Sequence, residues 1–318
     1  MIGKVALIGA AGAIGKTVAR TLDARGLEYR VVGRNRAALE TAFAQSGLAT
    51  ISTWNPDDPT SVRAAVRGAD TLVYLVGVPY DQFQLHPVLM KRTLEGASAE
   101  GVKQMLLIGT VYPYGMPRTT PVKEDHPREA HTFKGRMRKE QEDALLEADA
   151  AGKIRGAVLR LPDFYGPGVE RSLLDGIFQA AAHGKTANMI GPIDTPHEFV
   201  FVPDVGPVVL ALIDKPEAYG RWWHLAGAGA MTQREIAERV FEMVGRKPRL
   251  RVAGNTTLRL LGIFNPFLRE LVEMNYLLTN PVLLNDSALH GLLGEIHKTP
   301  YEEGLRLSLA AARQSRQT

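Results

Sequence analysis

The sequence predicts an α/β protein built on a doubly wound parallel sheet, followed by a smaller C-terminal α/β region. Two observations support this fold class. Short apolar runs alternate with amphipathic segments over the first half of the chain, which is typical of a parallel sheet covered by helices on both faces. A glycine-rich turn directly follows the first apolar run. Right-handed crossovers between such strands then give the doubly wound arrangement.

The expected elements follow one another in strict alternation. The predicted strands are residues 4–8, 29–32, 49–52, 71–76, 104–108 and 155–161. The predicted helices are residues 12–25, 36–45, 59–67, 83–100 and 131–150, the last one after a polar loop over 112–130. We therefore expect residues 1–165 to form the first domain and residues 166–318 a substrate-binding region, with some of its segments returning to the first domain.

The second region is less regular. We expect strands at 198–202 and 222–226 and helices at 232–244 and 302–313. The tryptophans Trp222 and Trp223 lie in an apolar run and are expected in the core. Residues 258–278 are rich in leucine and aromatic side chains and are expected to cover a pocket or to make a subunit contact, with a helix break at 264–267.

Composition excludes several classes of protein. Of the 318 residues, 45% are hydrophobic and 23% are charged, which is a globular balance. The net charge of +4 does not by itself indicate nucleic-acid binding. Cysteine is absent, so disulfides, thiolate metal sites and a cysteine nucleophile are excluded. No apolar run approaches about 20 residues, and we see no secretion signal. We expect a cytoplasmic protein that takes a small-molecule substrate and binds neither nucleic acid nor membrane.

The glycine turn indicates a dinucleotide site. Gly9, Gly12 and Gly15 fall between the first strand and the first helix. One allows the tight turn, one lets the backbone approach a pyrophosphate, and one lets the helix pack on the sheet. The first-turn N–H groups around Ala13 and Ile14, with the helix dipole, then face the phosphates. This makes residues 1–165 a Rossmann dinucleotide-binding domain; the alternative is a glycine turn without a ligand.

The end of the second strand bears on the choice of cofactor. A carboxylate there would bind the ribose 2′-hydroxyl of NAD. This chain has Arg34, Asn35 and Arg36 instead. A guanidinium suits a phosphate, so NADP is favoured over NAD. The alternative is that both arginines are solvated residues of the next helix.

At this point the chain resembles the extended branch of the short-chain dehydrogenase/reductase superfamily, the NAD-dependent epimerase/dehydratase family. The resemblance covers nearly the whole length and rests on motifs in the family's order. They are the GxxGxxG turn at 9–15, Asn55 after the third strand, Val76-Gly77 after the fourth, Thr110 four residues before Tyr114-Gly115, the segment 160–168 that contains Pro162, and the segment 201–205. The resemblance implies that Asn55, Val76, Gly77 and Pro162 line the cofactor.

The resemblance also implies a catalytic Tyr-x-x-x-Lys pair on the helix after the fifth strand. Here Lys134 takes the place of the tyrosine and Arg138 that of the lysine, and no tyrosine occurs between Tyr114 and Tyr165. The first possibility is that Lys134, with its pKa lowered by neighbouring positive charge, donates the proton while Arg138 holds the ribose.

Other possibilities stay open for this segment. Tyr80, Tyr112 or Tyr165 could replace the missing phenol, or the protein binds the dinucleotide without catalysis. Residues 134–139 could also be a solvated basic helix start, or could receive an acidic substrate.

Thr110 is the expected partner of the substrate. A hydroxyl at the end of a central parallel strand faces the cleft and can hydrogen-bond a carbonyl oxygen; the alternative is a threonine that merely closes its strand. His126 and His131 have no recognised metal-ligand spacing, so no metal site is expected, although His131 is an alternative proton donor.

Together these patterns predict an NADP(H)-dependent oxidoreductase that transfers hydride to or from a carbonyl or alcohol carbon with a non-tyrosine proton donor. The alternatives are a sugar-nucleotide epimerase or dehydratase and a non-catalytic NADP-binding sensor. A homodimer is possible, because the resembled family often dimerises through the helix that follows Lys134.

Overall fold

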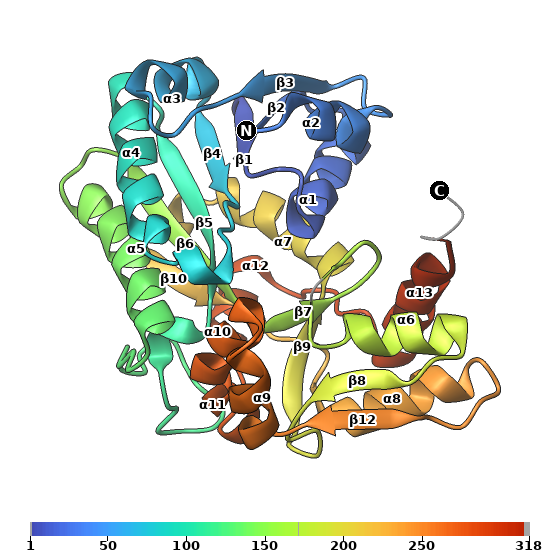
Figure 1. Ribbon diagram of the computed structural model, residues 1–318. Coiled ribbons are helices and arrows are strands. Elements are labelled where there is room, and N and C mark those ends of the chain that lie inside the picture. The colour runs from blue at the N-terminus through green and yellow to red at the C-terminus, as the bar shows by residue number, and fades with distance from the viewer. Residues whose placement is uncertain (1, 171, 315–318) are drawn as a thin grey trace.

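A seven-stranded parallel sheet forms the centre of the molecule in this computed structural model, which describes residues 2–170 and 172–314 (Figure 1). Its strands are β1 (Val5–Ile8), β2 (Tyr29–Gly33), β3 (Ala49–Thr53), β4 (Thr71–Tyr74), β5 (Gln104–Thr110), β6 (Arg155–Leu161) and β10 (Arg221–His224). They lie in the order β10-β6-β5-β4-β1-β2-β3, and every neighbouring pair is parallel. The predicted α/β class with a doubly wound parallel sheet is confirmed.

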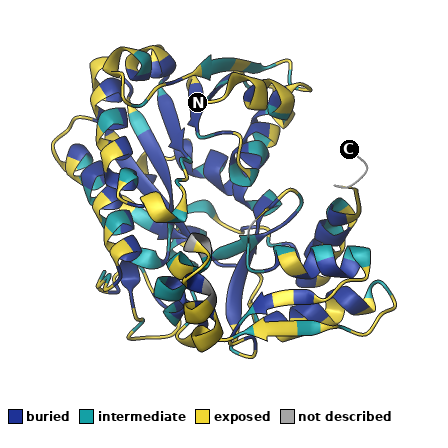
Figure 2. Ribbon diagram, in the orientation of Figure 1, coloured by how far each residue is buried: buried dark blue, intermediate teal, exposed yellow. Residues whose placement is uncertain are grey.

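Helices bury both faces of this sheet. On one face lie α1 (Ala13–Ala24), α2 (Arg36–Phe43) and α7 (Val202–Ile213), and on the other lie α3 (Pro59–Val66), α4 (Leu85–Ala99) and α5 (Phe133–Ala150). Because both faces are covered, the strands read as continuous apolar runs: all four residues of β1 and of β4 are buried (Figure 2).

Polar caps fix where several of these helices begin. The side chain of Asn35 accepts from the backbone N–H of Ala38 at 3.1 Å, and the side chain of Asp58 caps α3 just before Pro59. Thr132 accepts from the N–H of Gly135 at 3.0 Å and so sets the start of α5. Such caps satisfy N–H groups that have no partner inside the helix.

The strand order reverses between β1 and β4. The chain runs from β1 outward to β3 and then returns to the other side of β1. The loops that leave β1 and β4 therefore diverge and open a crevice at the carboxyl ends of the strands, where α/β sheets bind ligands. The sequence predicted a strand to Val76, but β4 ends at Tyr74, so Leu75 and Val76 lie in the loop at this crevice.

The C-terminal part forms a smaller second lobe. Its elements are β7 (Asp163–Tyr165), α6 (Asp175–His183), β8 (Ala187–Ile190), β9 (His197–Phe201), β11 (Ala230–Met231), α8 (Gln233–Glu242), β12 (Leu250–Ala253) and α13 (Tyr301–Gln314). The strands form a β11-β9-β7 sheet and a parallel β12-β8 pair, and their core packs against α6, α8 and α13. Several stretches beyond residue 165 lie in the first lobe: β10 extends the large sheet, α7 packs against α1, and α12 (Ser287–Leu293) places Leu289 in the same core beside β10.

Short helices close the remaining gaps. They are α9 (Asn255–Gly262), α10 (Pro266–Met274), α11 (Tyr276–Thr279) and α12 (Ser287–Leu293), with single 3-10 turns η1 (Tyr80–Gln82), η2 (Tyr112–Tyr114) and η3 (Pro216–Ala218). The expected helix break falls between α9 and α10, and Pro266 is the first residue of α10. Of the two tryptophans, Trp223 is buried and Trp222 is half-buried. The leucine-rich segment does cover a pocket, because Leu271 of α10 lines one.

Candidate active site

The glycine turn between β1 and α1 has the shape that a pyrophosphate needs. Gly9 has φ +84°, and a Cβ there would stand 2.8 Å from the backbone of Leu75. A Cβ on Gly15 would stand 2.2 Å from the carbonyl oxygen of Ala10. Gly12 is the N-cap of α1 and has open space where its Cβ would be. Two glycines thus permit the close packing of the turn, and the third leaves the helix N-terminus accessible to an anion.

A cavity of about 520 Å³ extends from this turn over the ends of β2 and β3. Its lining includes Gly12, Arg34, Asn35, Asp57 and Arg92. Arg36 and Asn55, which the sequence predicted to contact the cofactor, are not in this lining. Arg36 instead lies 3.5 Å from Glu40 in an exposed i,i+4 pair, and the side chain of Asn55 accepts from the N–H of Asp57 within its own loop.

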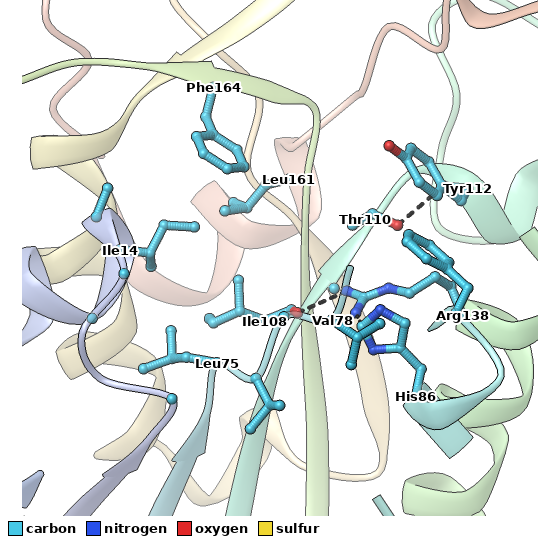
Figure 3. Close-up of a pocket in the computed structure, with 18 of the residues that line it drawn as sticks. Ile14, Leu75, Val78, His86, Ile108, Thr110, Tyr112, Arg138, Leu161 and Phe164 are labelled. Atoms are coloured by element: carbon cyan, nitrogen blue, oxygen red, sulfur yellow. Dashed lines mark hydrogen bonds between the residues drawn. The ribbon is translucent and has the colours of Figure 1, made fainter. Parts of the chain in front are cut away.

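A second cavity, of about 320 Å³, continues from the glycine turn toward the ends of β4, β5 and β6 (Figure 3). It is lined by many of the predicted cofactor residues: Gly9, Gly12, Ala13, Ile14, Gly15, Val76, Gly77 and Pro162. Both cavities share Gly9, Gly12 and Leu75–Val78. Together they form an elongated groove across the switch point, with the glycine turn at its middle.

A third cavity, of about 680 Å³, lies between the two lobes. It falls in the size range of small-molecule sites. Asp163, Glu170, Ser172 and Asn188 supply polar groups, and Leu271 of α10 closes one side. The third cavity meets the second at a neck, whose residues line both: Tyr80, Thr110, Tyr112, Leu161, Pro162 and Phe164.

Thr110 stands at this neck, at the carboxyl end of β5. It is half-buried, and its hydroxyl oxygen accepts from the backbone N–H of Tyr112 at 3.3 Å (Figure 3). The hydroxyl proton can then point into the neck toward an acceptor on a bound molecule.

Arg138 also borders the second cavity. Its guanidinium donates to the carbonyl oxygen of Ile108 at 3.1 Å and lies 3.2 Å from Nδ1 of His86 (Figure 3). Burial, together with this guanidinium, lowers the pKa of His86 to about 2. His86 is therefore neutral at physiological pH and serves as an acceptor for Arg138 rather than as a proton carrier.

The environment of Lys134 differs from the one predicted. Its ammonium lies 2.5 Å from Glu270 and 2.8 Å from Glu273, both on α10, and its backbone N–H donates to Glu273 at 3.0 Å. Burial on its own lowers the pKa of Lys134, but these two carboxylates outweigh it and raise the pKa above 10.5. The expected lowering of this pKa was wrong, because the nearest charges are negative.

Lys134 is not among the residues that line the second or the third cavity. The alternative of a solvated basic helix start is also wrong for this turn, since Lys134 and Arg138 are 1% and 7% exposed. Farther along α5, the carboxylate of Glu142 accepts from Nε of the buried Arg160 on β6 at 3.1 Å. Helix α5 is thus fixed to the sheet by one buried ion pair and to α10 by another.

Two of the three candidate tyrosines meet at the neck. The hydroxyl oxygens of Tyr80 and Tyr112 lie 3.0 Å apart, within hydrogen-bond distance. Tyr165 does not reach this place: its ring stacks on Tyr301 with centroids 5.7 Å apart in the core of the second lobe. His131 packs against Tyr276 and lines neither cavity at the neck. Within residues 2–170 and 172–314, no three His, Cys, Asp or Glu side chains are grouped to hold a metal ion.

Sequence reasoning missed several residues of the site. Phe164 and Val78 line the groove, and His86 supports Arg138. Glu270 and Glu273 were missed although their i,i+3 spacing on a helix was readable, because nothing in the sequence shows which cation they face.

A family model described as the NAD dependent epimerase/dehydratase family matches residues 5–224. The chain belongs to this family. The match covers every strand of the large sheet, the glycine turn and Thr110. The family's description implies a nicotinamide dinucleotide as the cofactor, and the groove lies across the switch point, where folds of this type bind dinucleotides.

Individual relatives give the same assignment of fold. A dTDP-6-deoxy-L-talose 4-dehydrogenase (NAD(P)(+)) of Kitasatospora kifunensis is 29% identical over 258 residues, which are 76% of this chain and 79% of that protein. The Bordetella bronchiseptica enzyme WbmH, solved with NAD+, is 20% identical with a TM-score of 0.77, and covers 99% of both chains. The dTDP-glucose 4,6-dehydratase DesIV of Streptomyces venezuelae, solved with NAD, is 17% identical with a TM-score of 0.82, over 99% of this chain and 98% of that one. No helix among the described residues is long and apolar enough to cross a membrane.

Proposed function

We propose that the protein is an NAD(P)-dependent oxidoreductase that transfers hydride to or from a carbonyl or alcohol carbon of a sugar nucleotide. The observation that carries this proposal is the neck at Thr110, where the dinucleotide groove and the large cavity between the lobes meet. At the neck, a molecule bound in the third cavity can place one of its carbon atoms next to a cofactor bound in the second cavity. The 29% identical relative, whose name is that of a sugar-nucleotide dehydrogenase, supports this substrate class.

The residues at the neck have distinct tasks in this proposal. A nicotinamide, when bound, supplies or accepts the hydride. Thr110 donates a hydrogen bond to the reacting oxygen and polarises its bond to carbon. Arg138, held by Ile108 and His86, presents its remaining N–H groups to ribose hydroxyls. Leu161, Pro162 and Phe164 exclude water from the neck.

We propose further that NADP is preferred over NAD. Support comes from Arg34, which lines the cavity of about 520 Å³ at the end of β2. A carboxylate at this position would select NAD. Arg36 pairs with Glu40 instead, and we propose no role for it in this preference. The solved relatives named above hold NAD, so the preference needs a direct test. We expect Arg34→Ala to weaken NADPH binding about tenfold or more relative to NADH, and Arg36→Ala to change neither. Equal loss for both cofactors in Arg34→Ala would contradict the preference.

The proposed reaction is tested with dTDP-6-deoxy-L-talose and related dTDP- and UDP-linked 6-deoxyhexoses, and with their 4-keto forms, by following nicotinamide absorbance. We expect turnover that falls about 100-fold in Thr110→Val, while the Kd of the dinucleotide stays within a factor of two. Interconversion of the sugars without net change in nicotinamide absorbance would instead support the epimerase or dehydratase alternative. Saturable dinucleotide binding with no conversion of any sugar in the panel would favour the binding-only alternative, which the buried ion pairs of Lys134 support.

A further inference from the structure

Two phenols from other parts of the chain meet at the neck, while Lys134 stands at the α5 position where the resembled family has its tyrosine. Tyr80 comes from η1 after β4, and Tyr112 comes from η2 after β5. Since β4 and β5 are neighbours in the sheet, their following turns bring the two side chains together. Their hydroxyl oxygens are 3.0 Å apart, and both residues line the neck with Thr110. Figure 3 shows Tyr112 beside Thr110.

Other acids near the neck are committed elsewhere. The ammonium of Lys134 is held by two carboxylates and does not line the neck. The ring of His86 is buried under Arg138 and stays neutral. Asp163 borders the large cavity, but its carboxylate lies 2.6 Å from Nε2 of His197, on the second lobe.

We propose that the Tyr80–Tyr112 pair exchanges the proton with the reacting oxygen, with Tyr112 as the donor and Tyr80 as its hydrogen-bond partner. This inference rests on the proposed function. In reduction, the carbonyl carbon accepts the hydride that a reduced nicotinamide supplies, and the carbonyl oxygen takes the phenolic proton. The O–H bond of Tyr112 breaks as that of the alcohol forms. The resulting phenolate accepts a hydrogen bond from Tyr80 until solvent returns a proton.

The charges around the pair come from three elements. Arg138 and Lys134 of α5 are positive, and the Lys134 ammonium lies 5.9 Å from the centre of the Tyr80 ring, while its own partners Glu270 and Glu273 on α10 are negative. Asp163 of β7 is negative. Burial dominates and raises the pKa of both phenols, assisted by Asp163 and opposed by Arg138. The pair is therefore protonated at neutral pH, which suits reduction, and oxidation should accelerate as pH rises.

A spectroscopic titration tests the pair without any substrate. A positive nicotinamide ring beside the pair favours the phenolate, so NADP+ or NAD+ should increase the phenolate absorption band in a titration that is carried above the ordinary tyrosine pKa of about 10, and NADPH or NADH should not. This increase should disappear in Tyr112→Phe and in Tyr80→Phe. It should persist in the matched control Tyr165→Phe, which removes a buried phenol outside the neck.

Binding of each dinucleotide, measured separately by fluorescence, separates the failure modes. If the oxidised dinucleotides bind but the phenolate band is unchanged, or survives in Tyr112→Phe, the assignment of the pair is overturned while the proposed function stands. If neither NADP+ nor NAD+ binds to the wild-type chain, both fail.

Kinetics with the most active sugar of the panel give a second readout. We expect Tyr112→Phe to lower kcat by about 10²–10⁴-fold with little change in KM, and Tyr80→Phe to lower it less while shifting the pH profile for oxidation. Tyr165→Phe should retain wild-type kcat. Undiminished kcat in Tyr112→Phe would overturn the assignment, and loss of dinucleotide affinity equal to the loss of kcat would also contradict it, since that pattern indicates a structural role.

Discussion

Single glycines in the first turn have separable roles. A methyl group on Gly15 would overlap the carbonyl oxygen of Ala10, whereas a methyl group on Gly12 would meet open space. Glycine at position 15 is therefore required by the fold itself, whereas glycine at position 12 is required by the ligand that we expect the turn to bind. This difference can be measured with one type of substitution at two sites.

We expect Gly15→Ala to lower the free energy of unfolding by about 2–3 kcal/mol, because backbone must shift to admit the Cβ. Gly12→Ala should change it by less than about 1 kcal/mol yet weaken dinucleotide binding about tenfold or more. Urea unfolding and fluorescence titration of the two variants check this. Normal affinity in Gly12→Ala would show that the phosphates do not approach this residue.

The residue scale also shows where sequence reasoning succeeded and where it could not. Thr110 and the glycines were readable because short, local motifs place them at strand ends. The charge environment of Lys134 was not, because its partner carboxylates lie 136 and 139 residues farther along the chain. Asn55 and Arg36 have their partners within their own loop or helix, and their contact with the cofactor stays a prediction.

At the scale of elements, α10 is fastened to α5 by the ion pairs of Lys134. We expect Lys134→Met to loosen α10, since two carboxylates lose a buried cation, and hydrogen exchange of amides 267–274 should accelerate. Amides of α4, which lacks this link, serve as the internal control. Unchanged exchange in α10 would mean that apolar packing alone holds it.

A second link between elements responds to pH. Glu198 of β9 is buried and accepts from the N–H of Leu284 at 3.0 Å. Burial raises its pKa from 4.5 to about 7, although Lys298 opposes the rise. The folded form therefore holds a proton that the unfolded form has lost, and the stability from this group falls as pH rises from about 4.5 to about 7.

We expect Glu198→Gln to gain stability relative to the wild type as the pH rises. The difference in free energy of unfolding between variant and wild type should increase by up to about 3 kcal/mol from pH 4.5 to above pH 7. Urea unfolding at both pH values measures this. Glu235 gives a control of opposite sign: hydrogen bonds from Thr232 lower its pKa, so Glu235→Gln should lose more stability at the higher pH. A pH-independent effect of Glu198→Gln would contradict the raised pKa.

Element boundaries were largely predictable from periodicity. The strands β2 and β6 and the helix α3 begin where the apolar pattern and the caps place them. The leucine-rich segment 258–278 was not divided into α9, α10 and α11, since these helices of 8, 9 and 4 residues span too few turns for apolar spacing to fix their ends.

At the scale of the whole molecule, the two lobes are not consecutive in sequence. Helix α7 buries Val205, Val209 and Leu212 against the face that α1 and α2 also cover, and β10 completes the sheet beside β6. A boundary at residue 165 therefore divides the sequence but not the packed lobes, because residues on its C-terminal side pack in both of them. Local patterns could not assign these later segments to the first lobe, because the pairing of β10 with β6 is a long-range contact.

We expect a fragment of residues 1–165 to lack a cooperative unfolding transition, since it leaves uncovered the part of the α1 face of the sheet that α7 buries. A fragment of residues 1–228 regains α7 and β10 and should recover a measurable transition. Thermal unfolding followed by circular dichroism, with binding of a hydrophobic dye, compares the two. Cooperative unfolding of the shorter fragment would show that α7 is dispensable.

Lys134 and Arg138 stand one helical turn apart. Lys134 is paired with α10, which closes one side of the third cavity, and Arg138 borders the groove at the switch point. The side of the third cavity formed by α10 and the side of the groove formed by Arg138 are therefore joined through α5. Natural variants that reshape α10, and with it the third cavity, must then alter three charged positions together. We therefore expect natural variation at 134, 270 and 273 to be correlated, with apolar residues replacing all three together rather than one at a time.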